Sequence, residues 1–533
     1  MSMPMESEPS GNPKSIPLWS HSAVELVARL RAGRTTAAAV LEAHIRRIQE
    51  VNPQLNAMIV PLFEQARVAA READAMRARG DVLGPLHGVP ITIKESFDIA
   101  ETPSTAGLAS RATLYAKTDN ALVERLKRAG AIVLGKTNVP QLLLYNEADN
   151  PLYGRTNNPW SDGRAPGGSS GGEAALIAAG ASVLGIGSDI GGSIREPAHS
   201  CGIHGLKPTS GRLSVNGSAD EWLLAGQEAV LAQPGPLARY VGDLAVVMQV
   251  LIGDVPAAPT IAPVPWRDPN AVEIDRLRIG MYTDDGYFPA APALRRAVRE
   301  ASAALREAGA EVIHFTPPDV ARAMHLFFAF LSADRATGAK RLLAGNPIDK
   351  RIRGLMQTVR MPAPVRGVTS ALLASLGQKR LVTILRSARG LTTRGYWDAI
   401  AERTEYQSRF YAALDADRLD AIICPPHALP ALTHGGSYFL SSAASYAMLY
   451  NLLGMPAGVV AATRVRAGEE SDRAKSRDIV ERAARRVESG SAGLPVGVQV
   501  IARHWREDVV LAVMQALEEH FSKQPDYPRL VSA

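Results

Sequence analysis

Residues 166–195 decide the fold, and they read PGGSSGGEAALIAAGASVLGIGSDIGGSIR. Two glycine-flanked serines, Ser169 and Ser193, lie near the two ends of this stretch. Between them, 173–179 is an alanine-rich helix pattern that a glycine ends, and 183–186 is a short apolar run typical of a buried strand. Turns and a strand end are therefore expected to bring two hydroxyls together, with little side-chain bulk around them.

The glycines before Ser193 leave a run of backbone N–H groups free to face one point. Such a run of N–H groups can stabilise a developing oxyanion. The residues that carry them are Ile190, Gly191, Gly192 and Ser193. Local sequence on its own favours a helix N-cap for Ser193, because serine is a common cap. The wider set of residues reverses that preference.

This wider set resembles the amidase signature family. The likeness rests on GGSSGG at 167–172, on DIGGSIR at 189–195 and on an upstream lysine in PITIKE. The catalytic set of that family is Ser–cisSer–Lys. By this resemblance Ser193 is the nucleophile, Ser169 is the bridging serine on a cis peptide bond, and Lys94 is the base.

The resemblance assigns further roles. Ser170, Asp189 and Arg195 are expected to hold the catalytic loops in place, and Leu143 and Leu144 are expected to bind substrate. Within the family, the chain looks most like the fatty acid amide hydrolase branch, on the motifs NPLYG, NPW, CGIHGLKPT and SYAMLYN.

Periodicity supports the same fold class. Helix patterns alternate with apolar runs, which indicates an α/β sheet with covered faces. Helices are expected at 22–31, 36–50, 62–79, 120–128 after an Asp119 cap, 292–308 and 441–453. Strands are expected at 85–93, 131–134, 183–186, 278–281, 311–315, 420–424, 458–462 and 496–501. The resemblance, which extends over about 22–521, implies a single large domain with a central twisted mixed β-sheet covered by helices on both faces.

The chain divides into a short tail and one long domain. Residues 1–20 form a polar tail without the charged start and apolar run of a signal peptide. The amidase signature domain is expected over 21–525, and within it 464–493 is charged and is expected as a surface insertion. The uncharged segment 443–463 contains Asn, Gly and Pro, so it is expected as a helix, a turn and a strand and not as a transmembrane helix.

The composition of the chain limits the classes of partner and cofactor that it is expected to bind. The 533 residues carry 59 basic and 53 acidic side chains, a near balance that argues against a nucleic-acid partner. Cys201 and Cys424 form no disulfide framework, which favours a reducing, cytoplasmic location. The histidines show no metal-ligand spacing, and no metal or cofactor is expected. The expected partner is a small-molecule amide, and a homodimer is left open.

Amide hydrolysis explains why these residue types belong together. Serine is a weak nucleophile, so it needs a base, an oxyanion site and a proton for the leaving amine. A lysine can act as the base when burial lowers its pKa from about 10.4. Lys94 follows an apolar strand, so its burial is expected. A second serine between lysine and nucleophile, Ser169, can relay the proton in both directions.

Three rival motifs fail on their context. Residues 167–171 fit G-x-S-x-G, but no buried strand precedes them. Residues 130–137 fit the phosphate-loop pattern, yet 131–134 are predicted as a strand after a helix, where a phosphate loop follows a strand and opens a helix. Gly185 and Gly187 begin a dinucleotide fingerprint, but Ile190 occupies its third glycine position.

Leucines mix with basic residues inside a predicted hydrophobic cap at 361–390. This composition suits an interfacial helix pair on an anionic membrane, although an amphipathic helix packed on the core has the same pattern. By resemblance, the cap is the membrane-docking element through which lipid amides enter. The cap has no aromatic residue, and Leu144 and Glu196 replace an aromatic and an apolar residue of the animal enzymes.

The predicted function is therefore hydrolysis of hydrophobic or fatty acyl amides through an acyl-enzyme on Ser193. Shorter acyl amides, anilides and carbamates are alternatives. Two other classes of function are a non-catalytic binding protein and a glutamine-hydrolysing amidotransferase subunit. Retention of the three catalytic positions argues against the first, and the leucine-rich cap argues against the second.

Overall fold

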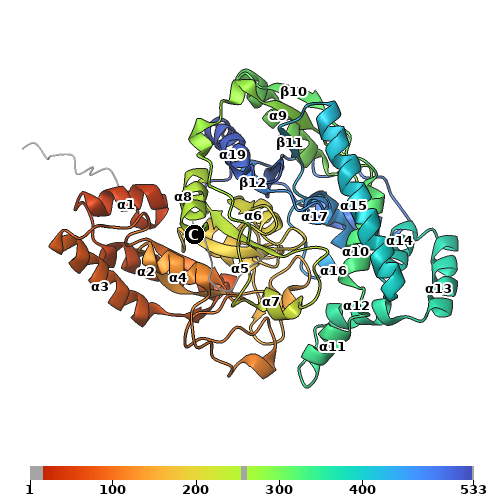
Figure 1. Ribbon diagram of the computed structural model, residues 1–533, viewed down its shortest axis with the longest axis horizontal. Helices are drawn as coiled ribbons and strands as arrows, with labels where there is room; N and C mark the ends of the chain where they lie inside the picture. The colour runs from red at the N-terminus through yellow and green to blue at the C-terminus, as the bar shows by residue number, and fades with distance from the viewer. Residues whose placement is uncertain (1–15, 254–260, 531–533) are drawn as a thin grey trace, which may run out of the picture.

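The computed structural model describes residues 16–253 and 261–530. In this part of the chain one large mixed sheet has the strand order β1-β3-β2-β6-β8-β7-β12-β13-β11-β9-β10. Its strands are β1 (Met58–Pro61), β2 (Pro90–Lys94), β3 (Ile132–Thr137), β6 (Leu184–Asp189), β7 (His204–Lys207), β8 (Gln233–Ala238), β9 (Arg278–Met281), β10 (Glu311–His314), β11 (Ala421–Cys424), β12 (Ala457–Arg464) and β13 (Pro495–Ala502). Figure 1 shows helices around this sheet, which confirms the predicted α/β class.

Two parallel strand pairs set up the part of the sheet that matters for function. β2 is parallel to β3 on one side and to β6 on the other, with Ile93 opposite Ile186. β6 then pairs antiparallel with β8, which makes the sheet mixed. Every residue of β2, β3 and β6 is buried, as expected for strands whose two faces are both covered by helices.

The helices surround the sheet in chain order. They are α1 (Ala23–Arg31), α2 (Ala37–Leu55), α3 (Phe63–Arg79), α4 (Ala121–Arg128), α5 (Gly171–Ala178), α6 (Arg195–Cys201), α7 (Ala219–Leu223), α8 (Val241–Leu251), α9 (Pro292–Glu307), α10 (Val320–Leu331), α11 (Thr337–Leu343), α12 (Lys350–Arg360), α13 (Ala363–Ser375), α14 (Lys379–Ser387), α15 (Thr393–Ala416), α16 (Ser437–Leu440), α17 (Ser445–Leu452), α18 (Ile479–Glu488) and α19 (Glu507–Phe521).

Local sequence explains several helix ends. Ser22 caps α1 and Thr36 caps α2, each accepting a hydrogen bond from a backbone N–H of the first turn. The predicted cap of α4 is wrong by one residue. Asn120, and not Asp119, accepts the bond from the Leu122 N–H, because the helix begins one residue later than the pattern indicated.

Small side chains let α5 lie close against the sheet. The helix is buried over its whole length. A Cβ at Gly187 of β6 would come within 2.5 Å of the Ser170 hydroxyl at the start of α5. The glycine in β6 is therefore needed for the close approach of the segment that carries the first serine pair.

The predicted cap at 361–390 contains two helices that differ in their packing. α14 packs against α10 and buries Val382 and Leu385. In α13, Ser370 is the buried residue, and most of the helix faces solvent. The core-packed alternative therefore describes α14, whereas α13 presents most of its surface to solvent.

The charged insertion at 464–493 contains α18 and binds the cap. The Arg380 N–H of α14 donates to Asp478 at 3.0 Å, and its guanidinium donates to Glu481 at 2.9 Å. The Gln378 side chain accepts a bond from the Ile479 N–H. The insertion thus anchors the first turn of α14.

Other sequence predictions have simple outcomes. Ile132–Thr137 form β3, so the phosphate-loop pattern lies in a strand. The uncharged segment 443–463 contains α17 and most of β12, as expected. Within the described ranges, no helix has both the length and the apolar character needed to cross a membrane. Of the predicted polar tail, residues 1–15 lie outside the described residues.

Candidate active site

The candidate site lies where parallel strands β2 and β6 end side by side. Lys94 is the last residue of β2, and Ser188 and Asp189 are the last residues of β6. Carboxyl ends of parallel strands meet at one edge of a sheet, where ligand sites of α/β proteins form. The turn after β6 carries Ser193, and the loop before α5 carries Ser169.

The Lys94 amine lies at the centre of this site. Its Nζ donates to the Ser169 hydroxyl at 2.8 Å and to the Ser188 hydroxyl at 2.9 Å, and it contacts the Ser188 carbonyl at 3.3 Å. The side chain has no exposed surface. Burial lowers the pKa of Lys94 to about 8, against the opposing effect of nearby carboxylates. A substantial fraction of this amine is therefore neutral near physiological pH.

Ser169 is held in place by a tightly packed loop. The Gly168–Ser169 peptide bond is cis, as the resemblance implies. A Cβ at Gly168 would lie 2.4 Å from the Glu147 backbone nitrogen, so only glycine fits there. The Ser170 N–H donates to the Ser193 carbonyl at 3.1 Å, which ties the two serine loops together.

The turn that carries Ser193 is shaped by Asp189. The Asp189 carboxylate accepts bonds from the Gly192 N–H at 2.8 Å and the Ile194 N–H at 3.1 Å. Gly192 has a φ of +114°, a conformation that favours glycine. Ser193 is 9% exposed. Among the described residues, no hydrogen bond joins the Ser169 and Ser193 hydroxyls.

The predicted oxyanion site needs one correction. The Gly192 N–H is already engaged by Asp189 Oδ1. Of the four predicted donors, the N–H groups of Ile190, Gly191 and Ser193 have no partner among the described residues. Three donors are therefore available to face an oxyanion.

Arg195 closes the Ser193 turn from its far end. Its guanidinium binds Asp189 through two bonds of 3.0 Å, and neither side chain has exposed surface. Burial opposes ionisation of Asp189, yet the positive charge and hydrogen bonds of Arg195 hold the pKa of this carboxyl below its usual range. The same guanidinium donates to Asn451 and Gln499 at 2.6 Å each. Asp189 and Arg195 thus lie where a supporting role requires them.

Sequence reasoning missed several residues of this site. Ser188 binds the Lys94 amine, and its signal was its place directly before Asp189, two residues after the predicted strand 183–186. Asn451 is the last residue of the motif SYAMLYN, to which no role was assigned, and Gln499 lies far from the signature in the chain. Their role comes from tertiary contacts with Arg195, which local sequence does not display.

Glu173 supports the site from α5. Its carboxyl accepts bonds from the Thr92 hydroxyl at 2.6 Å and the Thr137 hydroxyl at 2.9 Å. Burial raises its pKa to about 8. A largely neutral carboxyl here links α5 to β2 and β3 without placing a full charge beside Lys94.

Glu196 is another buried acid next to the nucleophile. Its side chain packs on Gly192, and burial and the negative charge of Asp189 raise its pKa well above the usual range. Burial and the nearby negative charge therefore favour the protonated form of this carboxyl. This explains how a carboxyl can stand at a position that is apolar in the animal enzymes.

The two predicted substrate-binding leucines lie beside an apolar cluster. We call it the inner apolar cluster; its buried members are Leu108, Leu142, Leu343 and Ile352. Leu144 packs against it, together with Trp222 of α7 and Met356 of α12. Leu143 is half-buried. The cluster adjoins the catalytic loops, because Tyr145 packs against it and the Tyr145 carbonyl lies close to Gly168.

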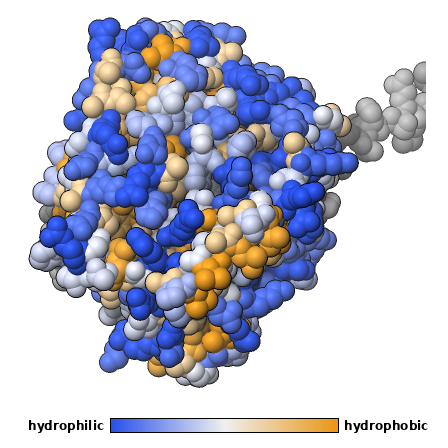
Figure 2. Space-filling view, turned by 90° about the vertical axis from the view of Figure 1, so that its right-hand side faces the viewer, coloured by the Kyte–Doolittle hydropathy of each residue, from blue (hydrophilic) through white to orange (hydrophobic). Residues whose placement is uncertain are grey.

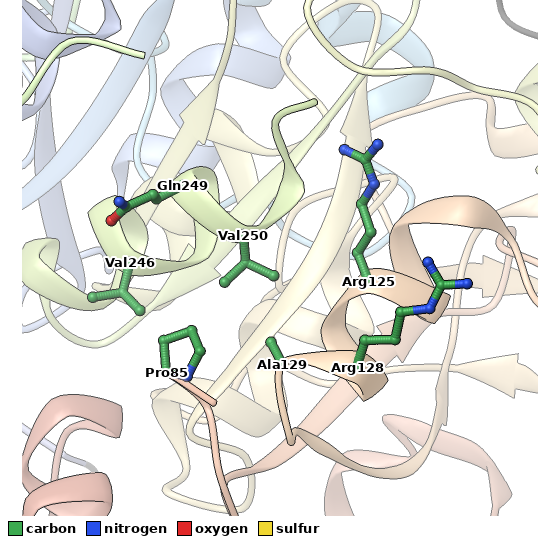
Figure 3. A pocket seen from close by; sticks show the side chains of 7 residues that line it. All are labelled: Pro85, Arg125, Arg128, Ala129, Val246, Gln249 and Val250. Carbon is green, nitrogen blue, oxygen red and sulfur yellow. The ribbon is translucent and has the colours of Figure 1, made fainter. Parts of the chain in front are cut away.

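A surface cavity of about 460 Å³ lies elsewhere, between α4 and α8. Figure 3 shows its lining, with Arg125 and Arg128 on one side and Val246, Gln249 and Val250 on the other. The predicted catalytic residues do not line it. This cavity is therefore not the site at which Lys94 and the two serines meet.

Comparison with known proteins shows the family to which the chain belongs. The family model described as Amidase matches residues 39–511. The chain belongs to the amidase signature family. This amidase is accordingly an enzyme that hydrolyses amides.

Its relatives cover nearly the whole chain. The amidase is 36% identical over 504 residues to fatty-acid amide hydrolase 1 of Sus scrofa, covering 93% of this chain and 84% of that protein. It is 32% identical over 516 residues to a glutamyl-tRNA(Gln) amidotransferase subunit of Chloroflexus aggregans, covering 94% and 97%. A solved structure of a fatty acid amide hydrolase matches with a TM-score of 0.84 at 27% identity, covering 95% of this chain and 86% of that one.

The Asp189–Arg195 pair generates a prediction about stability. Arg195→Met is expected to lower the free energy of unfolding by about 3–5 kcal/mol, because it leaves the Asp189 carboxylate buried and unpaired. Urea unfolding followed by circular dichroism measures the change. Arg394→Met is the control, since it removes an ion pair with Asp398 in which both side chains are exposed, and it is expected to cost less than about 1 kcal/mol. Equal stability of the two variants would contradict the structural role of Arg195.

Proposed function

We propose that this amidase cleaves hydrophobic amides through an acyl-enzyme on Ser193, with Ser169 and Lys94 as the relay and the base. The observation that carries the proposal is the 2.8 Å bond between the buried Lys94 amine and the Ser169 hydroxyl. A lysine whose pKa is lowered to about 8 can accept a proton near neutral pH.

The proposed reaction follows from this geometry. Neutral Lys94 takes the proton of Ser169, which takes the proton of Ser193 as the Ser193 hydroxyl attacks the amide carbonyl. The N–H groups of Ile190, Gly191 and Ser193 stabilise the oxyanion. Ser169 then returns a proton to the leaving nitrogen, and water cleaves the ester. A hydrogen bond between the two serines is expected to form with substrate bound, because catalytic contacts often tighten only then.

A hydrophobic acyl group is supported by the surroundings of the two serine loops. The inner apolar cluster adjoins Gly168, and a Cβ at Gly191 would lie 3.2 Å from Phe327 and 3.7 Å from Met448. Apolar side chains therefore border the reacting centre on both loops. The likeness to a hydrolase named for fatty acid amides points the same way. Shorter acyl amides, anilides and carbamates are the alternatives that a substrate panel separates.

Peripheral membrane contact through α13 is the second part of the proposal. Val365, Val368, Leu372 and Leu376 lie on one face of the helix and are 51–73% exposed. Figure 2 looks at the side of the molecule that carries α13 and shows a band of hydrophobic surface there. A second copy of the chain could cover the same face, so a homodimer is the competing occupant.

The basic residues of the cap divide into two sets. Arg366 donates to backbone carbonyls of the cap, including Ala388 at 2.9 Å, and Arg380 binds the insertion. Lys379, Arg386 and Arg389 are exposed. Three of the five basic side chains of the cap are thus placed to attract an anionic surface.

Ammonia release from glutamine is the alternative activity, supported by the likeness to an amidotransferase subunit. Incubation of the purified chain with glutamine and with a fatty acyl amide separates the two. Hydrolysis of the fatty acyl amide without a partner protein supports the proposal, and turnover of glutamine alone would replace it.

The nucleophile is tested by intact-protein mass after treatment with a long-chain fluorophosphonate. One adduct is expected on the wild-type protein and none on Ser193→Ala, because the serine oxygen that attacks phosphorus is gone. Ser170→Ala is the matched control and is expected to keep the adduct. Labelling of Ser193→Ala would refute Ser193 as the nucleophile. Labelling of the wild-type protein by a short probe alone would support a serine amidase but refute the proposal of long-chain substrates.

The base is tested by the pH dependence of kcat/KM. The value is expected to rise with pH around a midpoint near 8, because below that pH Lys94 is an ammonium that cannot accept a proton. Lys94→Met is expected to lose nearly all turnover. Lys136→Arg is the control, since burial also lowers the pKa of Lys136 to about 8 while an arginine does not titrate there. If the rise of kcat/KM with pH disappears in Lys136→Arg, it reports the titration of Lys136 and not that of Lys94.

Membrane contact is tested by co-sedimentation with vesicles that contain phosphatidylserine. The double variant Val368→Asp, Leu372→Asp is expected to bind at least about tenfold more weakly, since each charge in the apolar phase costs on the order of 2 kcal/mol. Val68→Asp, at an exposed position of α3, is the control. Unchanged sedimentation of the double variant would remove the membrane proposal, and its conversion from dimer to monomer in light scattering would assign the face to a second copy.

A further inference from the structure

Asp220 lies beside the end of β2 although it is distant from Lys94 in the chain. The Ala219 N–H at the start of α7 donates to the Ser96 carbonyl at 2.7 Å. The preceding residue, Ser218, pairs with Phe97 in an isolated bridge. These contacts fix α7 to the segment directly after Lys94, so that Asp220 enters the surroundings of the catalytic amine.

The Asp220 side chain is mostly buried, and one of its two carboxylate oxygens has no hydrogen bond within the part of the chain that the structure describes. The residue is 6% exposed, and its Oδ2 atom is buried without a hydrogen bond among the described residues. No salt bridge of the described chain includes it. Buried carboxylates are normally paired or hydrogen-bonded, because burial removes their hydration. Asp220 is therefore placed to interact with a group that becomes positively charged during the reaction.

Four carboxyl groups act on the charge of Lys94. In falling order of effect they are Asp220, Asp189, Glu173 and Glu95. Glu95 already accepts bonds from Thr105 and faces the buried Lys136 on the next strand. It therefore has its own partners.

The two remaining acids are also engaged. Asp189 is paired with Arg195 through two bonds of 3.0 Å. Glu173 accepts bonds from Thr92 and Thr137, and burial keeps it largely neutral. Asp220 thus differs from the other three, because its Oδ2 atom is buried without a hydrogen bond and the residue has no salt bridge among the described residues.

We propose that Asp220 is a positioning residue whose carboxylate stabilises the ammonium that Lys94 becomes when it takes the proton of the serine pair. This role rests on the proposed function of Lys94 as base. The proton leaves Ser193, passes through Ser169 and arrives on the Lys94 amine, so a positive charge appears in a buried site. An unpaired carboxylate nearby compensates that charge at the moment it forms, and no reorganisation is required.

The inactivation rate by a fluorophosphonate tests this role without involving a leaving amine. The Ser193 oxygen bonds to phosphorus, fluoride leaves, and the serine proton moves to Lys94, so the rate follows activation of the nucleophile alone. The inactivation rate is expected to rise with pH as Lys94 loses its proton, and we call this rise the low-pH limb. In Asp220→Asn the limb is expected to move to lower pH by about one unit or more, because loss of the opposite charge makes the ammonium less stable. The plateau rate is expected to fall, since Lys94 is then a weaker base.

Matched variants separate this role from a structural one. Glu221→Gln removes a charge from the next residue of α7, which is exposed, and is expected to leave the limb in place. Asp220→Glu is expected to restore the wild-type limb. Asp220→Ser removes the same charge with a different side chain and is expected to reproduce the shift if Asp220→Asn does not fold, as judged by circular dichroism.

An unmoved low-pH limb in folded Asp220→Asn, whatever its rate, would overturn the proposal. If the KM for amides that carry a cationic amine is raised in the same variant, Asp220 is assigned to substrate recognition instead. Failure of the wild-type protein to label at Ser193 would instead refute the proposed function, so the two failures are distinguishable.

Discussion

Asp189 and Arg195 form an ion pair with no exposed surface, and the turn between them presents Ser193. Asp189 accepts backbone N–H bonds inside the turn, while Arg195 closes it and reaches Asn451 and Gln499 on other elements. The position of Ser193, the proposed nucleophile, is therefore set by charges in the interior, where a fully satisfied network is rigid and a partly satisfied one is costly. The direction in which the neighbouring N–H groups point follows from the same pair.

The buried acids near Lys94 differ in charge because their contacts differ. Burial keeps Glu173 largely neutral although two threonine hydroxyls donate to it, and burial together with the negative charge of Asp189 raises the pKa of Glu196 well above its usual range. Asp189 is ionised and paired. Burial can then lower the pKa of Lys94 to about 8 without the surrounding carboxyls restoring an ordinary lysine. A base that works near neutral pH requires this balance and not burial alone.

Local pattern and long-range contact divide what the sequence can predict. The signature placed Lys94, Ser169 and Ser193 correctly at one edge of the sheet, because strand ends and glycine turns are encoded locally. Ser188 precedes Asp189 and Asp220 has no distinctive neighbour, but in both cases it is the tertiary contact with the surroundings of Lys94 that draws attention to the residue, and local sequence does not show that contact. The cap shows the same limit. Its basic residues share one composition, but which of them face inward depends on the partner surface and not on periodicity.

The cap and the catalytic site are connected by one helix. α12 contributes Ile352 and Met356 to the inner apolar cluster, and after Met361 and Pro362 the chain enters α13, whose apolar face is exposed. Asp478 and Glu481 of the insertion bind α14, so the exposed α13 is joined to a helix that is fixed in place. Under the proposed function, an acyl chain would pass from the exposed apolar face of α13 to the inner apolar cluster, and such a transfer costs little because apolar surface replaces water around the chain at both places. A polar α13 would remove this advantage, which under the proposal grows with the length of the acyl group.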